Sequence, residues 1–250
     1  MSESRGAGLV RVVAAELTKV GTSRAVLLTI AAVLVLPPTL AVAMGLNLRG
    51  ASAVTTAASA GFEVAGFGQP LIVLLAAMIV GGEYRDGLLR SSQLATPNRA
   101  RLFGAQCLVV TALSGGLAVV SIGTAVLLRH GVLGLADVPV SGLTPALAGN
   151  LFAVALNWTL MGLISAAVTV LARSVLVPVV VLVPLVLGLG IALVGVLPWL
   201  RFAPDLAGLQ LISPVPGLGL LDPVAGALVM ATWATVLLGA AQAVFSHRDL

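Results

Sequence analysis

Six stretches of this sequence run for about twenty residues with almost no charged side chain, the length that a helix needs to cross the hydrocarbon core of a bilayer. The composition agrees: 59% of the residues are hydrophobic and 9% are charged, whereas about 25% are charged in an ordinary soluble domain. Backbone groups in lipid must be hydrogen-bonded within their own segment, so these stretches predict helices. The sequence therefore predicts an all-α, polytopic membrane protein with one transmembrane domain over residues 1–250. The predicted spans cover residues 25–46, 64–82, 102–128, 145–171, 175–197 and 224–245.

The basic residues predict the orientation of these spans. Six spans place both termini on one side of the membrane, together with the loop at residues 83–101 and the turn at Arg173. All but three of the 13 Lys and Arg residues lie on that side, the exceptions being Arg49, Arg129 and Arg201. Basic residues are enriched in cytoplasmic loops, so we expect both termini in the cytoplasm.

The segment before the first span, "LVRVVAAELTKV" at residues 9–20, predicts an amphipathic helix. Its polar side chains, Glu16 and Lys19 among them, fall outside an apolar arc of about 120° at 100° per residue. Such a helix is suited to lie on the inner membrane surface, although it can also be a plain extension of the first span. The apolar arc holds Val10, Val13, Ala14, Leu17 and Val20.

Charge is densest in one internal segment, "GGEYRDGLLRSSQLATPNRARLF", which begins at Gly81. A short helix is expected over residues 84–95, because Pro97 disfavours helical geometry at the residue before it. Two interpretations compete: an ordinary solvated turn between two spans, or a short rigid helix through which a soluble partner moves both spans.

The sequence contains no recognisable motif for catalysis, ATP binding or metal binding. "LSGG" at residues 113–116 lies inside the third span, where small residues favour close helix packing, and no GxxxxGK[ST] loop occurs. The single cysteine, Cys107, has no partner for a disulfide or a metal site. The basic residues form no stripe with interleaved aromatics, which argues against nucleic-acid binding. We expect this chain to hold no cofactor and to catalyse no reaction.

The predicted spans are nearly free of ionisable side chains in their interiors, which disfavours a proton-coupled carrier. An ion-coupled carrier stays possible, because backbone carbonyls at helices broken by prolines such as Pro178 and Pro184 can bind ions. Within a span, Asn150, Asn157 and Trp158 can line a substrate path or hydrogen-bond between helices.

Four segments resemble the permease subunit of type-2 ATP-binding-cassette exporters. "GGEYRDGLLRSSQLATPNRARL" is similar to the most recognisable stretch of that family, with an acidic residue and glycine at the end of span two followed by proline and arginine. The sequence departs from the family at Gln106, where a lysine is frequent, and at His247, where a second arginine is common. The other similar segments are "AELTKV" followed by "TSR", "LISPVPGL", and the closing "FSHRDL".

The resemblance implies a bacterial cell-membrane exporter in which two permease subunits, identical or not, form a pathway above two separate ATPase subunits that bind ATP and Mg²⁺. It implies that the charged loop is a coupling helix, and that the region over residues 198–223 is a re-entrant or lid segment near the exit. The apolar spans favour a hydrophobic or amphipathic substrate. An ion-coupled carrier and a non-transporting scaffold or immunity protein are the alternatives. The residues implied for the ATPase contact are Glu83, Arg85, Asp86, Gly87 and Arg90.

Overall fold

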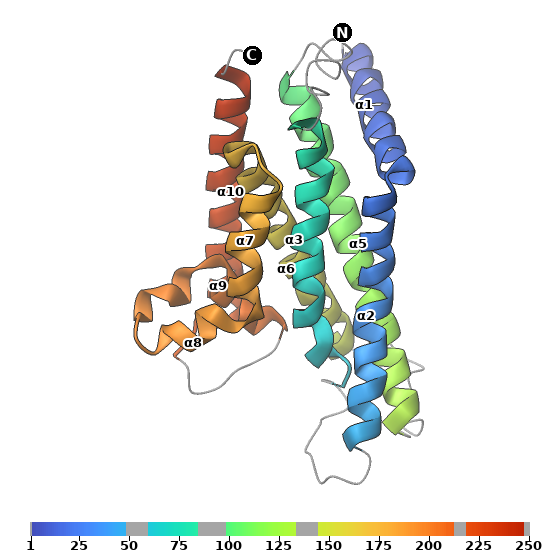
Figure 1. Ribbon diagram of the computed structural model, residues 1–250, viewed down its shortest axis with the longest axis vertical. Helices are drawn as coiled ribbons and strands as arrows, with labels where there is room; N and C mark the ends of the chain where they lie inside the picture. The colour runs from blue at the N-terminus through green and yellow to red at the C-terminus, as the bar shows by residue number, and fades with distance from the viewer. Residues whose placement is uncertain (1, 49–59, 85–98, 134–144, 213–218, 248–250) are drawn as a thin grey trace.

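The computed structural model describes residues 2–48, 60–84, 99–133, 145–212 and 219–247, and these residues form helices without strands (Figure 1). The helices are α1 (Ser2–Thr22), α2 (Arg24–Leu48), α3 (Ala65–Gly81), α5 (Arg99–Leu133), α6 (Pro145–Ala172), α7 (Leu176–Pro184), α8 (Gly190–Val194), α9 (Pro204–Ile212) and α10 (Pro223–His247). Short 3-10 turns lie at Phe62–Val64, Gly82–Tyr84 and Pro198–Phe202, and a π-helical turn lies at Leu185–Leu189.

The six predicted spans are confirmed, since six helical segments are long and apolar enough to cross a membrane. The fifth consists of α7, the π turn and α8 in succession. The largest difference from the sequence prediction is at α5, whose 35 residues extend for roughly 50 Å at 1.5 Å per residue. This helix is long enough to project beyond a hydrocarbon core of about 30 Å.

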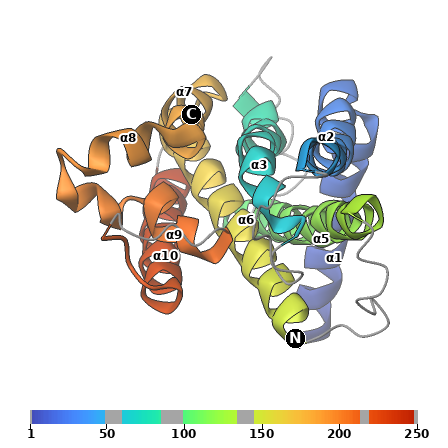
Figure 2. The same cartoon turned by 90° about the horizontal axis from the view of Figure 1, so that it is seen from below.

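Helix α6 lies at the centre of the molecule and contacts α3, α5, α9 and α10. Seen from below, it runs obliquely between a group formed by α2, α3 and α5 and a second group formed by α7, α9 and α10 (Figure 2). The start of α1 and the end of α10 lie at the same end of the bundle (Figure 1). We call this the termini end and the opposite one the far end.

Small residues let the central helices approach closely. A Cβ atom at Gly162 would lie 2.7 Å from Ser114 Oγ, and one at Gly115 would lie 3.1 Å from Thr159 Oγ1. The "LSGG" residues therefore serve the packing of α5 on α6, as their place inside a span predicted.

Trp158 of α6 fills the space between α6 and α3. Its side chain is fully buried, and its Nε1 donates a hydrogen bond to the carbonyl oxygen of Ala65 at 3.2 Å. The indole ring lies against Gly68, where any Cβ atom would overlap with it. Gly68 and Trp158 are thus complementary in shape.

The chain between α7 and α10 forms a hairpin at the far end, and we call residues 185–212 the far hairpin. Helix α7 is broken after Pro184 by the π turn, where Gly188 has a φ of 117° that side chains disfavour. Helix α8 then projects sideways and α9 returns to the bundle, where it packs on α6 and α10 (Figure 1). This return packs part of the apolar region between the last two spans against the bundle.

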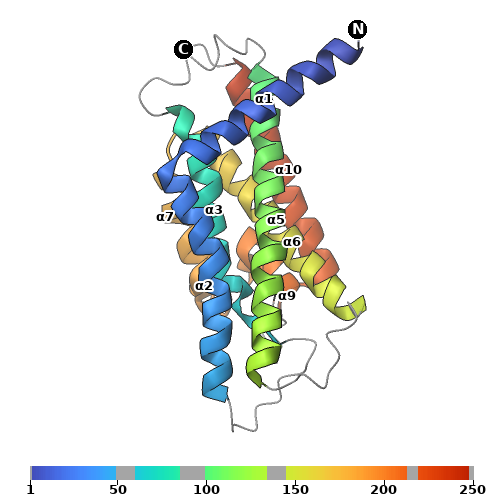
Figure 3. The same cartoon turned by 90° about the vertical axis from the view of Figure 1, so that its right-hand side faces the viewer.

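The predicted N-terminal helix is confirmed as α1, and it is separate from α2. The two helices meet at Ser23, and α1 crosses the end of α5 at an oblique angle to α2 (Figure 3). Part of the predicted apolar arc does not face the protein, because Val10 and Leu17 are exposed while Glu16 and Val20 are buried. Some apolar side chains of α1 thus pack against the rest of the protein, and others face its surroundings.

Candidate functional site

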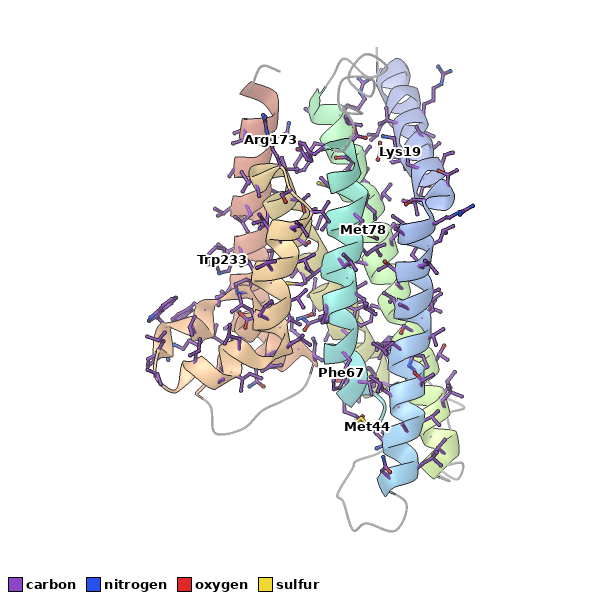
Figure 4. The ribbon with its side chains drawn as sticks, viewed as in Figure 1. Lys19, Met44, Phe67, Met78, Arg173 and Trp233 are labelled. Carbon is purple, nitrogen blue, oxygen red and sulfur yellow. The ribbon has the colours of Figure 1, made fainter. Side chains whose placement is uncertain are left out.

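Three charged side chains meet where α1 approaches the 3-10 turn that follows α3, and we call Glu16, Lys19 and Glu83 the termini-end cluster. The ammonium of Lys19 lies 2.7 Å from Glu16 Oε1 and also pairs directly with Glu83 Oε1 (Figure 4). The exposed fractions of Glu16 and Glu83 are 2% and 5%, whereas Lys19 is half-exposed. The cluster joins two helices whose charges lie 64 positions apart in the sequence.

The electrostatics of this cluster favour a charged lysine. Burial lowers the pKa of Lys19, but the hydrogen bonds and charges of Glu16 and Glu83 outweigh burial and raise it above its usual value. Burial raises the pKa of Glu16, while the hydrogen bond and charge of Lys19 oppose this rise. One cation thus holds two carboxylates that would otherwise repel each other.

The end of α3 is also in contact with the turn between α6 and α7. A Cβ atom at Gly81 would overlap with the side chain of Val175, so the two backbones lie close together. Tyr84 is near enough to Arg173 to feel its charge, and Arg173 itself has the positive φ of 51° that reverses the chain direction (Figure 4). The chain entering the charged loop is therefore fastened on two sides.

Of the five residues that the sequence proposed for a partner contact, only Glu83 lies within the described residues. Arg85, Asp86, Gly87 and Arg90 lie outside them, and so does the short helix expected over residues 84–95, except for its first residue, Tyr84, which ends a 3-10 turn. Glu83 is paired with a lysine of α1, Lys19.

The three residues proposed for a substrate path are not brought together. Asn157 is buried and receives a hydrogen bond from Gln69 Nε2 at 2.5 Å, while its own Nδ2 donates to the carbonyl oxygen of Gly208 at 2.8 Å. These bonds tie α6 to α3 and α9. Trp158 is buried against α3, and Asn150 is exposed in the first turns of α6.

Sequence reasoning missed a second ion pair, at the far end. Arg129 was placed in a loop, which is wrong: it lies in α5, is fully buried, and its Nε is 3.0 Å from Glu63 Oε1. Its Nη1 donates to the carbonyl oxygen of Ala41 at 3.3 Å, and Gly45 leaves the space that its side chain occupies. In the sequence, a charged residue close to the end of an apolar run looks the same whether its side chain is buried in an ion pair or lies in a loop.

Replacing Arg129 by methionine is expected to cost about 1–3 kcal/mol of stability. Glu63 would lose its cation, but its exposed fraction of 25% and the hydrogen bond from the Gly61 amide limit the loss. The measurement is equilibrium unfolding in detergent. The variant pair E63Q/R129M should be more stable than R129M alone, and equal stabilities would argue against the ion pair.

Within the described part of the chain, no group of three or more His, Cys, Asp or Glu residues could hold a metal ion. The termini-end cluster offers hydrogen bonds and charge, and neither a nucleophile nor a metal ligand set. What it can do is mechanical, because it holds two helices and the start of a loop in one arrangement.

Comparison with known protein families identifies the family to which this chain is similar. A model of the ABC-2 family of transporter proteins matches residues 12–191, a region that begins within α1 and ends within α8. No curated protein matches the chain significantly. The matched region includes the termini-end cluster, the Glu63–Arg129 pair and Asn157.

Proposed function

Because the chain belongs to the ABC-2 family of transporter membrane proteins, we propose that it is the permease subunit of an exporter driven by a separate ATP-binding-cassette ATPase. In this proposal the termini end faces the cytoplasm of a bacterial cell, as the distribution of basic residues favours. ATP and Mg²⁺ bind to the ATPase. A hydrophobic or amphipathic substrate leaves the cell through a pathway formed with a second permease subunit, identical or different.

The proposed mechanism rests on one observation, the buried ion pair that holds Glu83 in place. This residue stands directly before the charged loop, and its buried carboxylate is paired with Lys19 of α1. A force applied to the loop by a partner therefore reaches α3 through the backbone and α1 through the ion pair. Glu83 acts as a positioning residue in this proposal, whereas the loop residues touch the ATPase.

The loop residues have the chemistry for such a contact. Arg85, Asp86 and Arg90 provide charges of both signs that complementary side chains of an ATPase groove can pair with, which gives specificity and orientation. Gly87 allows the partner's backbone to come close. The contact requires the loop to have a fixed position relative to the spans, and the termini-end cluster supplies the fixed point.

A native pull-down from the organism's own membranes tests this proposal. The tagged protein is solubilised in mild detergent, and co-purified proteins and ATP hydrolysis are measured for the wild type and for R85A/D86A/R90A. We expect an ATPase with the wild type and at least about tenfold less of it with the triple variant, since interface anchors contribute more than about 1.4 kcal/mol each.

The matched control is R11A/R24A, which removes two exposed basic residues from the same end of the molecule. It should keep the ATPase. If the control and the triple variant lose the ATPase equally, the loop is not the docking segment. If no ATPase accompanies the wild type, the permease mechanism is wrong.

The break in α7 is the observation that favours an ion-coupled carrier, because broken helices supply carbonyl oxygens for ions. Transport that persists after ATP depletion would establish that alternative. A non-transporting scaffold or immunity protein would be indicated if ATP turnover responded to no candidate substrate.

A further inference from the structure

Asp205 is a buried acid to which neither the fold nor the proposed coupling mechanism assigns a part. It is the second residue of α9, with an exposed fraction of 7%, and neither of its carboxylate oxygens makes a hydrogen bond of normal geometry within the described residues. A buried carboxylate that lacks hydrogen bonds of normal geometry has lost its hydration without full replacement, which disfavours the ionised form.

The carboxyl group of Asp205 rests on the neighbouring helix of the far hairpin. Its Oδ2 lies so close to Gly190 of α8 that a Cβ atom there would overlap with it. The contact exists only while α9 is docked beside α8. Separation of the two helices would return the carboxyl group to water.

Among the described residues, no cation pairs with this acid from the elements packed around it. Among the elements packed against α9, the described parts of α6, α8 and the π turn have no ionisable side chain. The 3-10 turn carries Arg201, which is exposed and stacks on Phe202 at 4.9 Å from the ring centroid rather than pairing with Asp205. The sequence of α10 contains one ionisable residue, His247, which is the last residue of that helix.

The far hairpin has a bend on which it can pivot. The π turn and the left-handed Gly188 separate α7 from α8, and the hairpin is held to α10 in part by a hydrogen bond from Trp233 Nε1 to the carbonyl oxygen of Phe202 at 2.7 Å (Figure 4). Non-helical geometry within a helix is a frequent site of hinge motion.

We propose that Asp205 is a proton-binding site that keeps α9 docked on α8 within the far hairpin when it is protonated and lets the two helices separate when it is ionised. The neutral acid can stay between α8 and α9 at low cost, whereas the carboxylate gains its hydration only when the two helices separate. The ligand of the site is a proton, because the acid lies against backbone with no cation beside it.

The pKa of Asp205 in the docked state determines how docking depends on pH. Burial raises the pKa of Asp205, and the backbone amides of Leu206 and of Asp205 itself oppose the rise without cancelling it. Docking is therefore fully favoured below the ordinary pKa of an aspartate, about 4, and is lost as pH rises through the higher pKa of the docked state.

Hydrogen–deuterium exchange of the peptide over residues 204–212 tests this proposal. The protein is reconstituted in nanodiscs of zwitterionic lipid, and rates measured from about pH 4 to about pH 9 are divided by the intrinsic exchange rate at each pH. In the wild type we expect the corrected rate to rise with pH, by about tenfold for each unit by which docking raises the pKa. In D205N the rate should stay low at all pH values, because the amide cannot ionise.

Two control variants separate the acid from its surroundings. D222N removes an exposed aspartate whose Oδ1 accepts hydrogen bonds from the Val224 and Ala225 amides, and it should keep the wild-type pH dependence. W233F removes the hydrogen bond to Phe202 and should raise the rate without shifting its midpoint. A flat wild-type profile, or the same pH dependence in D205N, would overturn the proposal. The wild-type profile decides the matter even if D205N fails to fold.

Discussion

Replacing Lys19 by methionine is expected to destabilise the protein by about 3 kcal/mol, because two nearly buried carboxylates would lose their cation. Removal of one partner from a buried ion pair costs about 3–5 kcal/mol, and the half-exposed position of Lys19 puts the expected loss at the lower end of that range. The measurement is equilibrium unfolding in mixed micelles, followed by the far-UV signal.

The variant series for Lys19 distinguishes lost charge from lost packing. E16Q/K19M/E83Q removes all three charges and should recover most of the stability, since no carboxylate is then left unpaired. R11M removes an exposed basic residue of the same helix and should change the stability by less than about 0.5 kcal/mol. Equal losses for K19M and R11M would show that the termini-end cluster does not stabilise the junction of α1 and α3.

Replacing Trp158 by alanine is expected to cost about 3–5 kcal/mol, which is typical when a large buried aromatic side chain leaves a cavity. Gly68 has no side chain to move into the space, and the carbonyl oxygen of Ala65 would lose its donor. The same unfolding assay measures this loss.

W199A is the matched control for W158A, because Trp199 has an exposed fraction of 64% in the 3-10 turn of the far hairpin. Its loss should be small beside that of W158A. If the two variants were equally stable, the contact between α3 and α6 would not depend on the indole ring. Phenylalanine at position 158 should recover part of the packing without the hydrogen bond.

The spans were predictable because hydropathy acts residue by residue along the chain. A run such as residues 145–171 has no charged side chain, and the structure ends the corresponding helix at Ala172. The turn at Arg173 was predictable for the same reason. The excess length of α5 was not, because charged and polar residues near its ends lower the local hydropathy without breaking the helix.

The candidate site was predictable only in part, since its contacts join residues that are remote in sequence. Nothing local connects Lys19 with Glu83, and the helical arc of α1 placed Glu16 on the polar side although the fold buries it. Pro184 suggested a disturbed helix, but the left-handed Gly188 and the burial of Asp205 depend on how α9 returns to the bundle. Such features arise from tertiary packing, which a hydropathy pattern does not describe.

The ion pairs suggest an order for the biosynthesis of the protein. The three ion pairs described above each join two positions within residues 16–129, so both partners of each pair have left the ribosome once α5 has emerged from it. Arg129 emerges last, after Ala41 and Glu63, and can be neutralised as its helix enters the bilayer. Asn157 must wait for Gly208 before its bonds are complete. We therefore expect the N-terminal half to assemble in the membrane while the C-terminal half is still being translated.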